Sequence, residues 1–369
     1  MPKSLRVDVA VVGSGPAGAT AALHLARQDA RVLLVGRHRK RAISIGEGLP
    51  PAAQPLLETL GLWERFLAGG HLPSYGNRSA WGAAELTDTD FIFSPYGHGW
   101  HLNRRAFDAM FVDAARDSGA VLACATHVKW ESAGAGGVLR LRDTTKEMVI
   151  HADALLDCSG RAAVVAQRLG ARRIHEDKLV AISVLHTPGI PGDADATTMV
   201  EAQPEGWWYT ALLPQGRRIF VYLTDGDLPG VRAVRDLEHW LTRLRQTEHI
   251  RRLHQQFQYQ PLVGPEIFAA GSSLLHPPGG EHWLAAGDAA ISADPLSSQG
   301  IITAISTGHR AAMAIAGAMD GDPHAVDSYL SAVGQLARHY LTERAKYYAA
   351  EQRWATSPFW RRRAVNVRP

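Results

Sequence analysis

The sequence predicts a mixed α/β protein with two domains and a helical C-terminal segment. Residues 7–35 read as a β-branched strand, a glycine-rich turn, an alanine-rich helix and a second apolar strand, which is the order of a Rossmann-like βαβ unit. Residues 172–263 hold four strand-like runs separated by polar turns, which indicates an antiparallel sheet. A chain of 369 residues is long enough to bury a core in each domain.

The glycine-rich turn predicts a dinucleotide site. Its first glycine allows a tight turn, the second lets the backbone approach a pyrophosphate, and the third lets helix and strand pack closely. Backbone N–H groups at the start of the following helix attract phosphate. An ordinary glycine-rich turn is the alternative. The expected contacts are Gly13, Gly15, Pro16, Ala17 and Gly18.

The acidic residue that usually binds the ribose hydroxyls, about 20 positions after the glycine motif, is missing. Position 36 is glycine, and a basic run from Arg37 to Lys40 precedes the first acid, Glu47. Either other groups hold the ribose or the adenosine is bound more loosely. We expect Arg37 to neutralise a phosphate, and a solvated charged turn is the other interpretation.

The composition narrows the class of protein. Charged residues make up 20%, hydrophobic residues 46%, and the formal net charge is +3, which is ordinary for a soluble protein and gives no broad field for nucleic acid. Two cysteines, Cys124 and Cys158, fit a reducing compartment and exclude a disulfide scaffold. We find no signal peptide and no transmembrane run, so we expect a cytoplasmic protein without a nucleic-acid or membrane partner.

The remaining patterns predict the order of elements and the domain boundaries. A discontinuous nucleotide-binding domain is expected over 1–70, 98–171 and 265–324, a substrate domain over 71–97 and 172–264, and a helical segment over 325–369. The Arg-rich end, Arg361 to Arg363, is expected to be solvated. Helices are expected at 52–67, 104–118, 237–257 (one or two helices), 301–319 and 325–353, and strands at 121–128, 138–141, 148–151, 154–157, 180–186, 197–201, 207–213, 218–224 and 283–286.

Three separated motifs, Gly13–Gly18, Asp157–Arg161 and Gly287–Gly300, together resemble the FAD-binding fold of flavoprotein monooxygenases of the p-hydroxybenzoate hydroxylase class. The resemblance covers nearly the whole chain. It implies a Rossmann-like FAD-binding domain with an inserted antiparallel substrate sheet, and it implies that the carboxylate of the GD motif binds the flavin ribityl chain. Further implied FAD contacts are Glu47, Arg104, Gly160, Gly287, Asp288, Pro295, Ser298, Gln299, Gly300 and Ile301.

A narrower resemblance joins Ile45–Pro51 to the GEA/GES-x-P segment of the flavin-dependent tryptophan halogenase superfamily. Two halogenase features differ in this chain. No lysine occurs between Lys40 and Lys129, where halogenases carry the lysine that relays hypohalous acid, and the W-x-W-x-I-P motif is replaced by the different stretch Trp207–Pro214. The chain is also shorter than a typical tryptophan halogenase, so we do not expect halogenation.

Residues 70–82 and 97–102 resemble a short, halogenase-like subgroup that includes the maturation flavoproteins of the lysine ε-oxidase and glycine oxidase type. This implies an FAD-dependent monooxygenase that uses flavin C4a-hydroperoxide chemistry on an aromatic group, a tryptophan of a peptide or protein partner during cysteine tryptophylquinone biogenesis. A hydroxylase of a free small aromatic in natural-product biosynthesis and a non-catalytic flavin-binding maturation chaperone are the alternatives. NAD(P)H and a separate flavin reductase both stay open as the electron source.

The candidate catalytic residues are His98, His101 and Glu47. The two histidines lie three positions apart in a glycine-flanked loop, and either can act as a general base or a proton donor; without a clear third ligand we expect no metal site. Glu47 either hydrogen-bonds near the flavin or caps the next helix, and Arg104 either contacts the FAD adenosine side or forms a salt bridge. The aromatic residues expected to line a substrate pocket, or else to be core, are Trp81, Trp100, Trp207, Trp208 and Tyr209.

Overall fold

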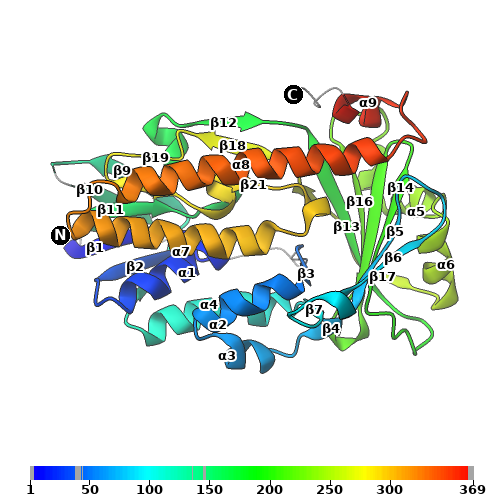
Figure 1. Cartoon of the computed structure of the whole chain (residues 1–369), viewed down its shortest axis with the longest axis horizontal. Coiled ribbons are helices and arrows are strands. Elements are labelled where there is room, and N and C mark those ends of the chain that lie inside the picture. The colour runs from blue at the N-terminus through cyan, green and yellow to red at the C-terminus, as the bar shows by residue number, and fades with distance from the viewer. Residues whose placement is uncertain (1–3, 38–42, 44, 135, 144–146, 365–369) are drawn as a thin grey trace.

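The computed structural model describes residues 4–37, 43, 45–134, 136–143 and 147–364. Two units lie side by side (Figure 1): a sheet covered by the long helices α1, α4 and α7, and a large antiparallel sheet with α5 and α6 on its outer side. Helix α8 (Ala325–Ala350) runs along both units. The predicted fold class, an α/β FAD-binding fold with an antiparallel sheet and C-terminal helices, is confirmed.

The first unit is built around strand β1 (Ser4–Val12), which pairs in parallel with β2 (Val32–Gly36) and β11 (Glu147–Asp157). The parallel part of this sheet continues through β8 (Val121–Cys124) and β20 (Trp283–Ala285). The second halves of β1 and β11 are apolar and buried because both faces of the sheet are covered there, whereas the edge strand β8 is largely exposed. The antiparallel additions are β9 (His127–Ser132), β10 (Gly137–Arg142) and β19 (Gly279–Gly280).

Strand β11 corrects the expectation of two short strands at 148–151 and 154–157. It is one strand of 11 residues, whose first half pairs antiparallel with β10 and which pairs in parallel with β1 along its length. The expected strand at 121–128 is instead divided into β8 and β9. Both errors arise because strand limits depend on pairing partners far away in the sequence.

Helix α1 (Pro16–Ala26) packs between α4 (Arg104–Asp117) and α7 (Gly300–Met319). The contact with α7 is close, because a Cβ built on Gly308 would lie 2.2 Å from the carbonyl oxygen of Ala17. Small residues on both helices therefore let the middle of α7 approach the start of α1 closely.

The second unit is a seven-stranded sheet in the order β17-β13-β16-β15-β14-β5-β6. Its pairs are antiparallel except β14 with β5. The segment 71–97 contributes β5 and β6 to this sheet, and β17 runs across the expected boundary at 264/265. The bounds are β5 (Gly76–Ala80), β6 (Thr87–Asp90), β13 (Leu179–Thr187), β14 (Thr198–Gln203), β15 (Gly206–Leu212), β16 (Arg218–Asp225) and β17 (Gln260–Ala269).

Two predicted helices are interrupted. The stretch 52–67 forms η1 (Pro51–Ala53), α2 (Gln54–Thr59) and α3 (Trp63–Leu67), and the break includes Gly61 at φ +63°, a conformation that ends helices. The stretch 237–257 forms α5 (Leu237–Leu244) and α6 (His249–Gln256). The buried Glu201 carboxylate accepts hydrogen bonds from the backbone N–H groups at the start of α6, which fixes its beginning.

Two small three-stranded sheets complete the parts that frame the site. A small antiparallel sheet joins β3 (Gly48–Leu49) and β4 (Leu72–Ser74) to β7 (Gly99–His101), where the two units meet. A further small sheet lies under α8. It contains β12 (Arg172–His175), β18 (Ser273–His276) and β21 (Ile291–Ser292).

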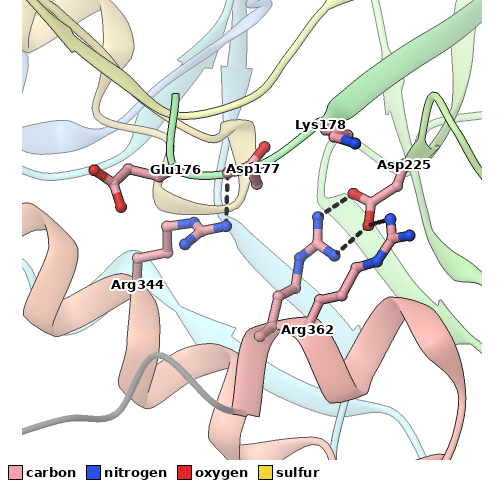
Figure 2. A pocket seen from close by; sticks show the side chains of 7 residues that line it. Glu176, Asp177, Lys178, Asp225, Arg344 and Arg362 are labelled. Carbon is pink, nitrogen blue, oxygen red and sulfur yellow. Dashed lines mark hydrogen bonds and ion pairs between the residues drawn. The ribbon is translucent and has the colours of Figure 1, made fainter. Parts of the chain in front are cut away.

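Helix α9 (Pro358–Ala364) corrects the expectation of a solvated arginine tail. Arg363 is 3% exposed and forms a two-bond ion pair with Asp225, at 2.7 and 3.1 Å. Arg362 pairs with Asp225 at 3.0 Å and with Asp227 at 2.6 Å. Asp225, Arg362 and Arg363 line a cavity of about 270 Å³ between α8, α9 and the end of β16 (Figure 2). The C-terminal helix is therefore held to the second sheet by charge.

Among the residues described, no helix combines the length and apolarity that crossing a membrane requires. The same residues contain no group of three side chains that could hold a metal ion.

Candidate active site

The glycine turn between β1 and α1 is fixed by steric contacts at two positions. Gly13 has φ +114°, and a Cβ there would lie 2.1 Å from the carbonyl oxygen of Cys158. A Cβ on Gly18 would lie 1.8 Å from the carbonyl oxygen of Gly13. Gly15 is different, because a Cβ there would meet nothing within 4 Å. The turn thus uses its outer glycines for packing and leaves open space at the middle one.

The N-terminus of α1 faces this open space without a side-chain cap. Gly15 is its N-cap residue, Pro16 follows it, and its first turn contains no acidic residue. The free backbone N–H groups and the positive end of the helix dipole together favour a phosphate group.

Position 36 at the end of β2 lies against the side chain of Ser14. A Cβ at Gly36 would lie 2.8 Å from the hydroxyl oxygen of Ser14 in the glycine turn. A larger residue there would therefore need the Ser14 side chain to turn away. Arg37 follows as an exposed residue, and His38 to Lys40 of the basic run lie outside the described residues.

Asp157, at the end of β11, organises the second predicted motif. Its Oδ1 accepts hydrogen bonds from the backbone and hydroxyl of Ser159 at 3.0 and 2.6 Å. Its Oδ2 accepts from the backbone N–H groups of Val165 and Ala166 at 2.9 and 2.8 Å. Both oxygens of this carboxylate therefore bind groups of the turn and hold its conformation. Gly160 lies in the turn with φ +74°, and a Cβ built there would meet nothing within 4 Å.

The third motif follows β20. Gly287 has φ +62°, and a Cβ there would lie 2.7 Å from the Cβ of Ala17 in α1, so this turn and the glycine turn touch. The Asp288 side chain is 39% exposed and lies 3.5 Å from the Nε atom of Arg161. Asp288 therefore presents a carboxylate acceptor at the edge of the phosphate region.

The segment 294–299, which we call the flavin loop, continues from this motif into α7. Pro295 begins the short helix η8 (Pro295–Ser297), Ser298 has φ +50°, and Ser298, Gln299 and Gly300 are exposed. Helix α7 begins without a side-chain cap or an acidic residue in its first turn, while Ile301 is buried. The loop offers backbone N–H groups and a positive helix end to a ligand with negative charge.

Glu47 and Tyr209 form a buried acid–phenol pair where the two units meet. Glu47 is 2% exposed, and its Oε2 accepts a hydrogen bond from the Tyr209 hydroxyl at 3.1 Å. Its Oε1 has no partner among the described residues. Burial raises the pKa of the Glu47 carboxyl, and burial also raises the pKa of Tyr209. The helix-cap interpretation of Glu47 is wrong, because neither η1 nor α2 has a side-chain cap.

Arg104 lies at the start of α4 and organises the segment before Glu47. Its Nη1 donates to the carbonyl oxygens of Ile45 and Gly46 at 2.6 and 3.1 Å, and its Nη2 pairs with Asp108 at 3.0 Å. The salt bridge that was the alternative interpretation of Arg104 is therefore present, and its contact with FAD stays a prediction. The positive charge of Arg104 also lowers the pKa of the Glu47 carboxyl against the effect of burial, which ties this arginine to the candidate acid.

The two candidate histidines have different environments. His101 in β7 is fully buried, its Nε2 lies 2.9 Å from the Thr198 hydroxyl, and burial lowers its pKa to about 4. It is neutral at pH 7. His98 is partly buried, its Nδ1 lies 2.9 Å from the carbonyl oxygen of Gly99, and its ring contacts Trp100 with the centroids 4.6 Å apart. The structure does not bring the two side chains to one ligand.

The five aromatic candidates do not line one cavity. Trp207 and Trp208 alternate across β15, so Trp208 packs on the opposite face from Tyr209, against Tyr222 and Trp240 with centroids 4.9 and 5.0 Å away. Trp81 donates to the carbonyl oxygen of residue 347 at 2.7 Å. Trp100 packs on Phe66 in the first unit. Of the five, Tyr209 hydrogen-bonds to Glu47 and Trp100 packs on the ring of His98.

The comparison that identifies the protein family covers most of the chain. Residues 6–344 match the family model described as the FAD binding domain. The chain belongs to this family. A protein of Marinomonas mediterranea named as an FAD-dependent oxidoreductase, LodB, is 28% identical over 363 residues, which cover 96% of each chain. The chain is accordingly an FAD-dependent oxidoreductase.

Two solved structures share the fold. The myxobacterial chondrochloren halogenase CndH has a TM-score of 0.88 and 22% identity, with 97% of this chain and 86% of that chain covered. The peptidyl tryptophan dihydroxylase QhpG, essential for tryptophylquinone cofactor biogenesis, has a TM-score of 0.79 and 24% identity, with 97% and 78% covered. Both likenesses extend over the flavin loop and the second sheet, because they span nearly the whole chain.

The residues present fit FAD. The open space at Gly15 and the uncapped start of α1 suit the pyrophosphate, the half-open carboxylate of Asp288 suits ribityl hydroxyls, and the exposed end of the flavin loop suits the isoalloxazine. When bound, FAD supplies the redox chemistry of the protein. We assign these three contacts as predictions that the FAD-binding fold supports.

Sequence reasoning missed two parts of this region. The first is the anchoring of the flavin loop by Tyr348 of α8, whose hydroxyl donates to Asp294 at 2.7 Å. The Asp-Pro pair at 294–295 predicts a capped turn, but no local sequence pattern predicts that Tyr348 binds it. The second concerns the aromatic stretch 70–100, whose composition favours part of a binding cavity but which forms an exposed apolar tip beside β7. The tip consists of Tyr75, Ile92, Phe93 and Tyr96.

Proposed function

We propose that the chain is an FAD-dependent monooxygenase that hydroxylates a tryptophan of a peptide or protein partner during maturation of a quinone cofactor. The name of QhpG, a peptidyl tryptophan dihydroxylase in tryptophylquinone biogenesis, and the end-to-end match with LodB support this class. Free thiols at Cys124 and Cys158 support a cytoplasmic site of action.

The exposed apolar tip is the observation that best supports a polypeptide as the substrate. Phe93 is 90% exposed and Ile92 76% exposed, and Tyr75 of the same group contacts His98 with the centroids 5.5 Å apart. The tip is therefore continuous with β7, which pairs with β3 beside Glu47. Large apolar side chains that stay exposed beside a site suit a protein surface better than a small substrate.

The Glu47–Tyr209 pair is the group that can hold and move a proton. A carboxyl whose pKa is raised by burial keeps a proton to higher pH, and one oxygen of Glu47 is free of partners among the described residues. The Tyr209 hydroxyl orients the other oxygen. His101 is neutral at pH 7 and is a second candidate, although the Thr198 hydroxyl and the Leu212 backbone already contact its ring.

Halogenation is the alternative that the comparisons bring forward, because CndH is a halogenase. The absence of any lysine between Lys40 and Lys129 speaks against it. A hydroxylase of a free small aromatic would leave the apolar tip without a role.

We propose NAD(P)H or a separate flavin reductase as the electron source, and comparing the rate of flavin reduction by NADPH with and without a reductase decides between them.

The test uses the FAD-loaded chain, reduced and then exposed to oxygen, with either a tryptophan-containing polypeptide or free tryptophan. Replacing Phe93 by serine removes one large exposed side chain, and burial of such a group contributes about 1.5–3 kcal/mol. We therefore expect kcat/KM for the polypeptide to fall roughly tenfold or more, with the rate on free tryptophan unchanged. Leu262→Ser, at a side chain 52% exposed on β17, is the matched control. Equal activity of both variants on the polypeptide would contradict the proposed substrate class.

A further inference from the structure

A buried polar network joins the flavin loop to α8. Asp294 is the first residue of the flavin loop and is 1% exposed. Its Oδ1 accepts a hydrogen bond from the backbone N–H of Leu296 at 2.9 Å, and its own N–H donates to the Tyr340 hydroxyl at 2.6 Å. Its Oδ2 accepts from the Tyr348 hydroxyl at 2.7 Å. Tyr340, Arg344 and Tyr348 are spaced by four and share one face of α8. One helix face therefore supplies the anchors on which the loop depends.

The Tyr348 hydroxyl is the junction of this network. It accepts a hydrogen bond from the indole Nε1 of Trp207 at 3.1 Å while it donates to Asp294. Trp207 stands two positions before Tyr209 on β15 and faces the same side of the sheet. The phenol oxygen thus lies between the sheet that carries the Glu47–Tyr209 pair and the loop that is predicted to border the isoalloxazine.

The surroundings hold the Tyr348 ring in place. Tyr348 is 3% exposed, and the guanidinium groups of Arg344 and Arg363 lie over its ring at 5.1 and 5.0 Å. Arg363 is fixed by its ion pair with Asp225, and Arg344 by a 2.7 Å pair with Asp177 (Figure 2). Ion pairs on both sides therefore leave the phenol little freedom to turn away from Asp294.

We propose that Tyr348 is a positioning residue for the flavin: its hydroxyl fixes the flavin loop through Asp294 and couples that loop to β15. The proposal rests on the proposed flavin site, and it is independent of the proposed substrate. The loop needs such an anchor, because Ser298 is held at φ +50°, a conformation that strains a residue other than glycine, and because the far end of the loop is exposed.

Loss of the hydroxyl has a defined consequence. Asp294 Oδ2 would be left buried with Arg344 Nε as its nearest cation, 3.6 Å away. The carboxylate then gains by turning toward the arginine, and the N–H of Leu296 loses its acceptor. The loop and the N-terminus of α7 shift together, so less positive potential reaches a reduced, anionic flavin.

The test compares Tyr348→Phe with Tyr347→Phe in the full-length, FAD-loaded protein. Tyr347 is the adjacent residue of α8, its side chain is 56% exposed, and only its backbone carbonyl accepts a bond from Trp81. For Tyr348→Phe we expect an altered absorbance spectrum of bound FAD, a midpoint potential that becomes more negative, and an FAD dissociation constant raised roughly tenfold. For Tyr347→Phe we expect all three to match the wild type.

A lower melting temperature of Tyr348→Phe with unchanged flavin spectrum and potential would overturn the proposal, since a merely structural tyrosine would behave that way. Where Tyr348→Phe does not fold, Tyr340→Phe decides, because it removes the acceptor of the Asp294 N–H. A folded Tyr340→Phe with wild-type flavin properties also overturns the proposal. No substrate is used, so a failed hydroxylation assay leaves this result intact, and wild-type protein that fails to bind FAD refutes the flavin site itself.

Discussion

Two alanine substitutions in the glycine turn should separate cofactor binding from packing. At Gly15 the backbone has φ −75° and a Cβ meets nothing within 4 Å, so alanine fits the apo protein. The change costs about 1 kcal/mol as an N-cap substitution. The added methyl group occupies the space in which a phosphate would approach the N–H groups of α1.

The loss of one hydrogen bond to a charged group is worth about 1.5–3 kcal/mol, and each 1.4 kcal/mol is a factor of about ten. Gly15→Ala should therefore raise the FAD dissociation constant roughly 10- to 100-fold. At Gly18 the new Cβ would lie 1.8 Å from the Gly13 carbonyl oxygen, so β1 and α1 must separate. Overpacking of this kind costs about 3 kcal/mol, far more than the helix propensity of alanine returns.

Urea unfolding of the two apo proteins and FAD titration by flavin fluorescence measure both effects. Gly18→Ala should lose stability before cofactor is added, whereas Gly15→Ala should unfold close to wild type and bind FAD weakly. Wild-type FAD affinity in a folded Gly15→Ala protein would refute the assignment of this turn to the phosphate. Equal destabilisation of both variants would refute the steric argument.

Three further outcomes follow from the buried groups. Burial lowers the pKa of His186 to about 3 and that of His254 to about 4, while histidines of the unfolded chain titrate near 6.5. The unfolded state therefore binds more protons, and the free energy of unfolding should fall as the pH drops from about 6.5 to about 4. A urea midpoint that stays constant across that range would contradict this. Glu47→Gln should keep the spectrum of bound FAD and lower kcat roughly 100-fold or more. The control Glu58→Gln, on the exposed side of α2, should change neither the spectrum nor kcat. Wild-type turnover by Glu47→Gln would show that Glu47 takes no part in the reaction. Arg363→Met should lower the free energy of unfolding by about 1.5–3 kcal/mol, because buried Asp225 loses its two-bond partner and keeps the 3.0 Å pair with Arg362; an unchanged urea midpoint would show that the Arg363 pair is not needed.

The local features of the fold were predictable from the sequence, and the long-range ones were not. The βαβ start was recognisable because Gly13, Gly15 and Gly18 stand between an apolar strand and an alanine-rich helix, each of which has its own period. The single strand β11 was not, because its length is set by pairing with β1 and β10. The burial of Arg363 was also missed, since its partner Asp225 lies 138 positions away.

The candidate site divides in the same way. The glycine turns were identified by spacing, and their geometry follows from steric contacts within and between them. The opposite placement of Trp208 and Tyr209 was available from the two-residue period of a strand. The Glu47–Tyr209 and Asp294–Tyr348 bonds join positions 162 and 54 residues apart, and no local pattern reveals such pairs.

The measurement that tests the central claim most directly is isotope labelling with ¹⁸O₂. The FAD-loaded chain is reduced, mixed with native lysate and halide under ¹⁸O₂, and the digested polypeptides are searched by mass spectrometry for labelled tryptophan, with the Glu47→Gln protein as the control. We predict ¹⁸O on the tryptophan of a polypeptide, dependent on the active chain. Label confined to small aromatic molecules, or tryptophan that carries halogen in place of oxygen, would contradict the proposed function.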